Sequence, residues 1–476
     1  MMHHMNRRKT KIVCTLGPAT DSSDGIAALI EAGMNVVRLN FSHGHRDDHR
    51  ATIRRIREVA QRLDREVGIL QDLGGPKIRL GVLPDEGVQL DAQHTVELAV
   101  EGQAPAGTLP VSYPYLLEDV AAGETILLAD GAAELEVIEV RSDRLLCRVV
   151  NGGLLTSRKG VNLPQANLRV PAVTEKDLLD LEVGLDEGVD FVALSFVRHE
   201  DDLAPVRERL TGLEHPPLLI AKIEKPQAVD RLNQIIEKVD GIMVARGDLG
   251  VEMPPEKVPV IQKMIIDAAR RAGRPVITAT QMLRSMVDSP RPLRAEASDV
   301  ANAVFDGTDA LMLSEETAIG NYPNEAVQML HRVALEAEVY IGEKSWSTDP
   351  STPATPDITG AISRAACKLA EEIGAAAIVT ATTSGSTARL IARHRPGTPV
   401  LGVTTSVAVA RQLSLSWGVV PTTTSQTSDL AAIGKALVSK LSSFELAKQG
   451  DHVVIAAGLP LGFSDSANVL RIHQLE

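Results

Sequence analysis

The fold is decided between residues 190 and 314, where five apolar runs follow one another: DFVALSFV (190–197), LLIAKIE (218–224), GIMVARGD (241–248), PVITATQ (275–281) and DALMLS (309–314). Each run has the length and composition of a buried strand. Between them lie amphipathic stretches with helical periodicity, for example AVDRLNQIIEKV (228–239) and EKVPVIQKMIIDAARRAG (256–273). This alternation indicates βα units around a parallel sheet.

Three further runs precede this region: IVCTLG (12–17), NVVRLNF (35–41) and VGILQD (67–72), with a helical pattern over 48–63. Three strands and five make eight, which is the number that a closed (β/α)₈ barrel, or TIM barrel, requires. Such barrels carry their chemistry at the C-terminal ends of the strands. The polar residues that end these runs are therefore the first candidates for a functional site.

The count of eight holds only when residues 75–170 are set aside, because they show strand-like alternation and no convincing helix. We predict that they form a small β-barrel domain inserted into the TIM barrel, which then comprises 1–74 and 171–343. Residues 344–357 are rich in Ser, Thr and Pro and predict a linker. Renewed αβ alternation over 358–476 predicts a separate, open α/β domain.

The charge balance and the cysteines exclude several classes of protein. The chain of 476 residues has 49 Lys and Arg against 62 Asp and Glu, and this net charge of −13 disfavours nucleic-acid binding. Three widely spaced cysteines, Cys14, Cys147 and Cys367, are typical of neither a disulfide framework nor a zinc site. We find no signal peptide and no apolar run of the ~20 residues that span a bilayer. We therefore expect a cytoplasmic protein without nucleic-acid or membrane partners.

Two charged residues end the fifth predicted strand, and a third ends the sixth. Lys222 and Glu224 stand two residues apart, so they share one face of the strand and can both point into the barrel mouth. Asp248 ends the next strand, and neighbouring strands are ~4.8 Å apart, so the two carboxylates can lie side by side. Such a pair suits Mg²⁺, and a lysine beside it can stabilise a developing anion. The alternative is a structural ion pair between Lys222 and Glu224.

Further polar residues end the second, third and seventh strands. Arg38 can hold a phosphate or carboxylate with two hydrogen bonds, although a salt bridge at the rim is the alternative. The oxygens of Asn40, Ser42 and Asp72 together resemble a pocket for a hard cation, although each residue type is also common in caps and turns. Thr280 adds a hydroxyl to the mouth. These residues indicate a Mg²⁺-dependent barrel enzyme that acts on a small anion.

Seven longer segments resemble the pyruvate kinase family, in that family's order and over nearly the whole chain. They are CTLGPAT (14–20), GMNVVRLNFSHG (33–44), KGVNLP (159–164), EKD (175–177), DGIMVARGDLGVE (240–252), ATQML (279–283) and RAEASDVANAVFDGTDALMLS (294–314). The resemblance implies transfer of the phosphoryl group of phosphoenolpyruvate to ADP, which gives ATP and pyruvate in the final step of glycolysis. The rival interpretations are another Mg²⁺-dependent barrel enzyme of pyruvate enolate chemistry and a metabolite sensor without catalysis.

The resemblance also implies roles for single residues. Arg38 would hold the transferring phosphoryl group, and Lys222 would stabilise its charge and that of the enolate. Glu224 and Asp248 would bind Mg²⁺, while Thr280 would position the pyruvate carboxylate near the path of enolate protonation. The backbone that assists Thr280 would be that of Ala245, Arg246, Gly247 and Asp248. The nucleotide side would be formed by Thr15, Pro18, Asn40, His43, Arg79 and Lys159. The inserted domain would close over the mouth as a lid.

One segment departs from the family where a monovalent cation would bind. Members that require potassium resemble DTKGPEIRT in the third-strand segment, where this chain has DLGGPKIRL (72–80). The resemblance places the cation pocket at Asn40, Ser42, Asp72 and Leu73. Lys77 stands where such members have an acidic residue, and its ammonium could replace K⁺. We therefore expect K⁺ to be dispensable; the alternative is an exposed lysine at the lid hinge with K⁺ still bound below.

A loop in the C-terminal domain is the candidate effector site. It consists of Thr383, Ser384, Gly385, Ser386 and Thr387, ahead of the helical segment ARLIARHR. Hydroxyls and backbone N–H groups at a helix N-terminus form an anion site, although a plain N-cap is the alternative. Similar loops bind the phosphate of an effector in activated pyruvate kinases. The resemblance thus implies a phosphorylated allosteric effector and, separately, a homotetramer.

Overall fold

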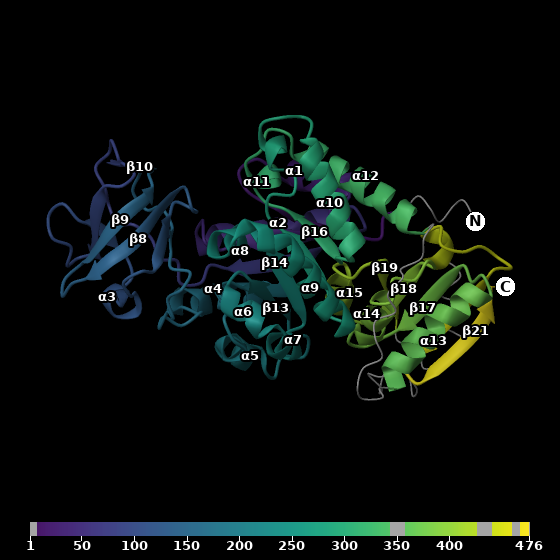
Figure 1. Ribbon diagram of the computed structural model, residues 1–476. Helices are drawn as coiled ribbons and strands as arrows, with labels where there is room; N and C mark the ends of the chain where they lie inside the picture. The colour runs from purple at the N-terminus through teal and green to yellow at the C-terminus, as the bar shows by residue number, and fades with distance from the viewer. Residues whose placement is uncertain (1–6, 343–357, 426–439, 459–466, 476) are drawn as a thin grey trace.

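A closed parallel barrel lies at the centre of the molecule (Figure 1). The structure is a computed structural model that describes residues 7–342, 358–425, 440–458 and 467–475, so the predicted linker at 344–357 lies outside the described residues. The barrel strands, in spatial order, are β1 (Lys11–Thr15), β2 (Val36–Asn40), β3 (Gly68–Leu73), β12 (Phe191–Leu194), β13 (Leu218–Ile223), β14 (Gly241–Ala245), β15 (Val276–Ala279) and β16 (Ala310–Leu313). Since β16 pairs again with β1, the predicted TIM barrel is confirmed.

Helices surround the barrel, and the longer ones bury an apolar face. They are α1 (Ser23–Ala32), α2 (Arg46–Arg62), α4 (Glu175–Asp186), α5 (Ala204–Leu210), α6 (Pro226–Asp230), α7 (Leu232–Lys238), α8 (Arg246–Glu252), α9 (Val258–Arg271), α10 (Arg294–Asp306), α11 (Glu315–Ala318) and α12 (Pro323–Gly342). Inside the barrel a separate apolar cluster includes Val13, Leu70, Phe191 and Met243, all fully buried. The barrel is therefore a packed core that holds the strand ends in fixed positions.

Two sequence predictions in this region are wrong. The helix predicted over 228–239 is two helices, α6 and α7, because Arg231 leaves the helical conformation at φ −105° and ψ 20° between them. Its guanidinium pairs with Glu200 at 2.5 Å between Nη2 and Oε1. Asp248 does not end the sixth strand: β14 ends at Ala245, and Asp248 lies in the first turn of α8.

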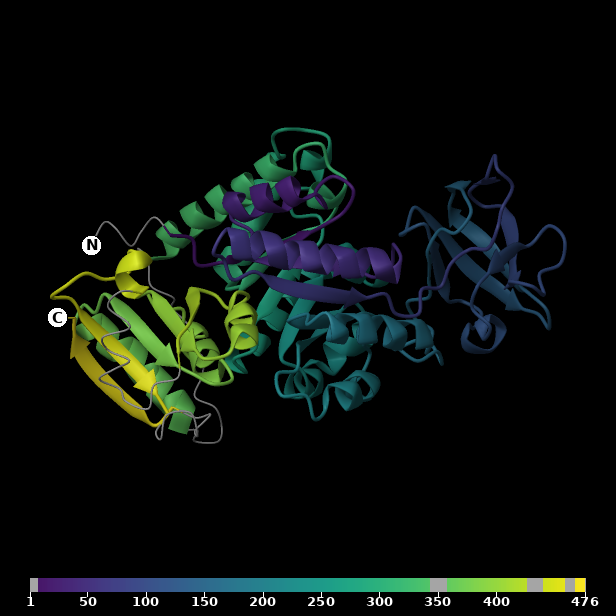
Figure 2. The same ribbon diagram turned by 180° about the vertical axis from the view of Figure 1, so that it is seen from behind.

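The inserted β domain follows β3 and has its own core. Its six-stranded sheet runs β11 (Val161–Asn162), β7 (Thr125–Leu128), β8 (Ala133–Val140), β9 (Leu145–Asn151), β5 (Thr95–Val100) and β6 (Leu109–Val111), beside the pair β10 (Gly153–Leu155) and β4 (Val88–Leu90). These strands form a nearly closed small barrel around Leu98, Ile126 and Leu135. The short helix α3 (Leu116–Asp119) was not predicted. The domain stands apart from the barrel mouth at one end of the molecule (Figures 1 and 2).

The C-terminal domain is a mixed sheet covered by helices. Four parallel strands, β19 (Val419–Thr423), β18 (Val400–Thr404), β17 (Ala377–Ala381) and β20 (His452–Ala457), pair in that order, and the antiparallel β21 (Val469–Gln474) completes the edge. Its helices include α13 (Ile358–Glu372), α14 (Ser386–Ala392) and α15 (Val407–Leu413). The open α/β domain is confirmed, but β21 was not predicted.

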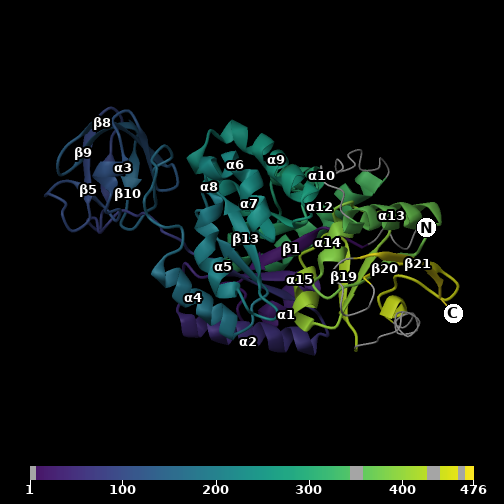
Figure 3. The same ribbon diagram turned by 90° about the horizontal axis from the view of Figure 1, so that it is seen from below.

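The C-terminal domain closes the N-terminal end of the barrel (Figure 3). Leu415 is fully buried and belongs to the apolar cluster inside the barrel. The Lys11 ammonium, on the first residue of β1, donates to the carbonyl of Val419 at 2.7 Å. Asp309, just before β16, accepts from the backbone N–H of Trp417 at 3.1 Å. Within the described ranges, no helix combines the length and the apolar character that a membrane span requires.

Candidate active site

A chain of ion pairs joins β2, β3 and β13 at the C-terminal end of the barrel. The Asp72 carboxylate lies 2.7 Å from Arg38 Nε and 3.3 Å from Lys222 Nζ. Lys222 Nζ also lies 2.8 Å from Glu224 Oε1. Burial alone would raise the pKa of Asp72, but the charges of Lys222 and Arg38 hold it below its usual value. The three strand ends therefore keep two cations and two carboxylates in one buried row.

The predicted shared face of Lys222 and Glu224 is present, because these side chains meet directly. Burial opposes the charge of Lys222, but Asp72, Glu224 and Asp248 together raise its pKa above the usual value. It therefore carries its charge at neutral pH. The ion pair between Lys222 and Glu224, which we named as the alternative, is thus present. It lies within the predicted site, so it does not exclude a role for the charged ammonium there.

Ser195 is a residue that the sequence analysis missed. The Lys222 ammonium donates to Ser195 Oγ at 2.7 Å, and that hydroxyl donates to the carbonyl of Leu73 at 2.9 Å. The backbone N–H of Phe196 donates to Glu224 Oε2 at 2.8 Å, and Phe196 has a φ of +58°. The end of the fourth strand therefore orients both Lys222 and Glu224. The position of Ser195 directly after a barrel strand was the only signal in the sequence that could have identified it.

The carboxylates of Glu224 and Asp248 suit a divalent cation. Glu224 is buried, whereas Asp248 is exposed at the mouth. Burial and the nearby charge of Asp248 raise the pKa of Glu224, while Lys222 lowers it. The two carboxylates are close enough to repel each other electrostatically, and one of them faces solvent. Together they supply negatively charged oxygens that a cation could bind. Mg²⁺ prefers such a set, so these residues fit the ion.

Thr280 is held in a strained conformation just after β15. Its φ is +68° and that of Gln281 is +55°, values that are unfavourable for residues with a Cβ. Arg246 fixes this turn, since its guanidinium donates to the carbonyls of Ala279 at 3.2 Å and Thr280 at 2.7 Å. The Thr280 hydroxyl in turn accepts from the Gly247 N–H at 2.7 Å. The structure thus joins Thr280 to the backbone of 245–248, and the side chain of Arg246 acts as a support.

The residues predicted for the nucleotide side fall into three groups. Thr15 is buried and accepts from Arg38 Nη1 at 3.0 Å, whereas Pro18 is exposed near the same strand end. Arg79 and Lys159 lie on the inserted domain, where Gly160 bridges to Arg79. The exposed His43 lies beside β2.

Positive charge surrounds His43. Burial and the charges of Lys77, Arg79, Arg38 and Lys176 lower its pKa. This concentration of cations next to the strand ends is typical of a site for phosphate groups.

The predicted cation pocket is occupied in part by internal contacts. Asn40 Oδ1 accepts from the Ser42 N–H at 3.2 Å, and Asp72 holds Arg38 and Lys222. Lys77 is exposed, and within the described residues its ammonium makes no hydrogen bond or ion pair with these oxygens. Partial removal from water and the charges of Lys222 and Arg79 lower its pKa, while Asp72 and Asp248 act in the opposite direction. The carboxylates of Asp72 and Asp248 therefore act electrostatically on Lys77, although no direct contact joins them among the described residues.

The candidate effector loop has the geometry of an open turn. Gly385 is the N-cap of α14 with a φ of +79°, so no side chain caps the helix through that position. Ser384 Oγ donates to Ser386 Oγ at 3.1 Å, and Arg389 Nη2 donates to the carbonyl of Ser384 at 3.0 Å. Thr387 is buried. Ser384 Oγ also accepts from the Ser386 N–H at 3.4 Å, and Thr382 Oγ1 accepts from the Gly385 N–H at 2.9 Å, so the plain N-cap with its turn stays the alternative for this loop.

Comparison with known proteins places the whole chain in one family. The pyruvate kinase barrel domain matches residues 7–327, and the pyruvate kinase alpha/beta domain matches 360–473. Over 475 residues the chain is 44% identical to a pyruvate kinase of Geobacillus stearothermophilus, which covers 98% of this chain and 80% of that one. It is 45% identical over 472 residues to a pyruvate kinase of Sporosarcina psychrophila, with the same coverage.

A solved structure agrees with these sequence matches. The crystal structure of a pyruvate kinase from Cryptosporidium parvum superposes with a TM-score of 0.92 at 36% identity, and it covers 100% of this chain and 98% of that one. The resemblance that the segments indicated is confirmed, and the two rival interpretations are not supported. With both domain matches and relatives of this identity over nearly its full length, the chain belongs to the pyruvate kinase family and is a phosphotransferase of that kind.

Proposed function

We propose that the row Arg38–Asp72–Lys222–Glu224 performs the phosphoryl transfer of this pyruvate kinase. The observation that carries the proposal is the buried pairing of these four side chains across three strand ends. Arg38 has a planar fork that suits a phosphoryl group, while the charged Lys222 lies where the enolate oxygen would develop its charge. Phosphoryl transfer depends mostly on such positioning and on neutralisation of charge.

The substrate carboxylate has its own holding site. The backbone of Ala245, Arg246, Gly247 and Asp248 at the start of α8 presents N–H groups, and the Thr280 hydroxyl lies against it. We infer that this site binds the carboxylate of phosphoenolpyruvate and of pyruvate. The strained φ of Thr280 fits a residue that is held in place for function. Thr280 then lies near the path of enolate protonation, and a water relay delivers the proton.

Glu224 and Asp248 would hold the Mg²⁺. When bound there, the ion supplies positive charge to the substrate oxygens. The chain itself keeps the site ready: Phe196 donates to Glu224 from the backbone, and Ser195 holds Lys222 beside it. The nucleotide phosphates would lie toward Asn40 and the cations around His43, with Thr15 and Pro18 nearer the base and ribose. We place ADP and ATP on this side, and we expect K⁺ to be dispensable.

The inserted domain is the proposed lid. It carries Arg79 and Lys159, and Asn162 on β11 donates to Glu252 Oε1 of α8 at 2.8 Å. Closure would bring the two cations to the nucleotide and exclude water that could intercept the phosphoryl group. A cytoplasmic location and a homotetramer are part of the same proposal, on the basis of the family alone.

Replacement of Asp248 by Asn tests the metal assignment. We measure ADP-dependent pyruvate formation in a coupled assay. The Mg²⁺ concentration that gives half of the maximal rate should rise about tenfold or more in the variant, because one negatively charged ligand is lost. Excess Mg²⁺ should restore part of the rate. The exposed Asp230→Asn, at the end of α6, is the matched control and should behave as the parent. An unchanged Mg²⁺ requirement for Asp248→Asn would remove this residue from the proposed site.

Replacement of Ser384 by Glu tests the effector loop. A carboxylate there would repel the phosphate of an activator, so activation across a panel of sugar phosphates and nucleotides should disappear. The basal rate should stay within about twofold of the parent, since the loop lies in another domain from the strand ends. Ser384→Ala is the matched control without added charge. If basal and activated rates fall together, the loop is not a separate site.

A further inference from the structure

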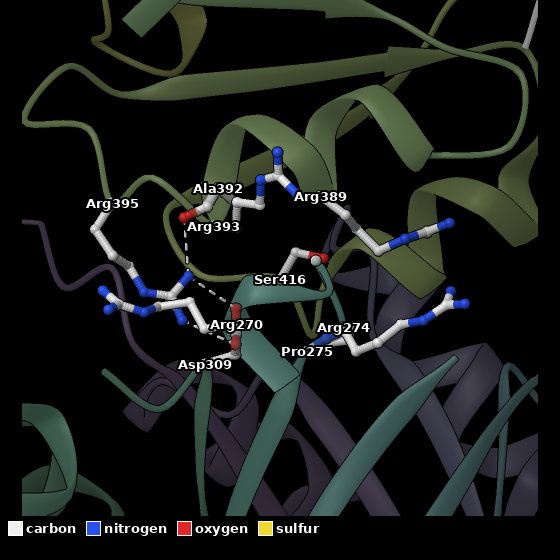
Figure 4. A pocket seen from close by; sticks show the side chains of 10 residues that line it. Arg270, Arg274, Pro275, Asp309, Arg389, Ala392, Arg393, Arg395 and Ser416 are labelled. Atoms are coloured by element: carbon white, nitrogen blue, oxygen red, sulfur yellow. Dashed lines mark hydrogen bonds and ion pairs between the residues drawn. The ribbon is translucent and has the colours of Figure 1, made fainter. Parts of the chain in front are cut away.

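A pocket lies between the base of the barrel and the C-terminal domain, and arginines from both line it (Figure 4). Arg270 and Arg274 come from the end of α9 and the turn before β15, whereas Arg389, Arg393 and Arg395 come from α14 and the residues after it. The two domains therefore contribute arginines to one pocket. We name these five residues and Ser416 the arginine cavity.

The charge of the arginine cavity is not balanced by its own carboxylates. Asp309 is the one acidic residue among the described residues that line it, and it pairs with Arg395 at 2.9 Å between Oδ2 and Nη2. Outside the lining, Asp267 lies 3.6 Å from Arg270, and Asp240 lies 3.9 Å from Arg274 but holds Arg207 at 2.9 Å. Like charges that are brought together out of water repel each other, so this space favours an anion.

Two buried polar atoms of residues that line the cavity have no hydrogen-bond partner among the described residues. Ser416 is 1% exposed, yet its hydroxyl makes no hydrogen bond, and neither does Nη1 of Arg389. Buried polar groups are nearly always hydrogen-bonded, so two such atoms in one cavity indicate a ligand or water. In Figure 4, Ser416 lies between the arginines of the two domains.

The orientation of Arg389 connects the cavity to another part of the domain. Its Nη2 donates to the carbonyl of Ser384, while Nη1, which lies beside Gly385, has no partner among the described residues. Burial lowers its pKa to about 10, so the guanidinium remains charged at neutral pH. An anion in the cavity would thus be bonded to the helix that follows residues 383–387 and, through Arg274, to the barrel.

We propose that the arginine cavity is a binding site for one phosphate group, distinct from both the active site and the loop at 383–387. The guanidinium forks of Arg274 and Arg389 and the Ser416 hydroxyl donate to its oxygens. A phosphate ion or a phosphate monoester carries the negative charge and the oxygen acceptors that these donors lack. Bound phosphate would join the C-terminal domain to the base of the barrel.

Titration calorimetry of the full chain with inorganic phosphate, against chloride at the same ionic strength, tests the proposal. Arg274→Gln should weaken one binding event about tenfold or more, the expected loss for one charged hydrogen bond. Arg274 suits the test because it is one-third exposed and Asp240 keeps its pair with Arg207, so the fold should survive. Arg389→Gln should have the same effect, and thermal melting checks that each variant is folded.

Arg271→Gln is the matched control, since Arg271 is adjacent to the cavity arginines on α9 but half exposed and paired with Asp267. It should bind phosphate as the parent does, and so should Ser384→Glu. If the parent, Arg274→Gln and Arg389→Gln bind phosphate equally well, the proposal is overturned. It is also overturned if Ser384→Glu loses this phosphate-binding event. A second titration with glycerol 3-phosphate shows which form of phosphate the site prefers. Weaker binding than that of inorganic phosphate indicates a site for the free ion, and tighter binding indicates a site for a phosphate ester.

Discussion

Replacement of Lys222 by Met should lower kcat on the order of 10²-fold or more while the chain remains folded. The ammonium lies 3.3 Å from Asp72 and 2.8 Å from Glu224, so it is the cation that pairs with both carboxylates of the row. Methionine keeps the length of the side chain but removes the charge that would stabilise the enolate. Single-turnover measurement of pyruvate formation, with thermal melting as a check of folding, gives the result.

Ser195→Ala distinguishes the effect of the charge on Lys222 Nζ from the effect of the orientation of that ammonium. The ammonium would lose its 2.7 Å hydrogen bond but keep its charge, so we expect a smaller loss of kcat than for Lys222→Met, about tenfold. A kcat for Lys222→Met within tenfold of the parent would show that this lysine does not stabilise the reaction. A Ser195→Ala loss as large as that of Lys222→Met would instead assign the main effect to orientation.

Turnover in K⁺-free buffer should be nearly full, and Lys77→Glu should create a K⁺ dependence of tenfold or more. Lys77 feels the charges of Asp72 and Asp248, and a positive charge near these carboxylates would make an added cation redundant. Glutamate restores the charge that K⁺-requiring members of the family have at this position. The assay uses a bulky organic cation to hold ionic strength constant.

Lys77→Met distinguishes the two parts of this prediction. It removes the ammonium without adding a carboxylate, so it should lower K⁺-free turnover but respond to K⁺ more weakly than Lys77→Glu. Tenfold stimulation of the parent by K⁺ would show that the lysine is an exposed hinge residue with K⁺ bound below.

The sequence predicted what depends on local periodicity. Lys222 and Glu224 were placed together because residues two apart share a strand face, and their 2.8 Å contact follows from that rule. Asp248 was predicted at the right end of the barrel but in the wrong element, since an apolar run does not show where a strand turns into a helix. Strand β21 was missed because half of its residues are exposed at an edge.

Contacts between distant segments could not be predicted. Ser195 reaches Lys222 across 27 positions, and a serine after a strand has the composition of an ordinary turn. The positive φ of Thr280 depends on Arg246, whose guanidinium holds the turn from the neighbouring strand end. The arginine cavity combines residues from 270 to 416, and the packing of the two domains alone brings them together.

The position of Leu415 at the base of the barrel has a consequence for synthesis on the ribosome. β1 needs β16 as a neighbour, and the apolar interior needs Leu415, yet roughly 300 and 400 residues separate them from β1. At about 5–20 residues per second, the early strands wait tens of seconds for these partners. The inserted domain has its own core and can fold meanwhile. The nascent barrel therefore presents unpaired apolar strands for most of translation, the state on which chaperones act.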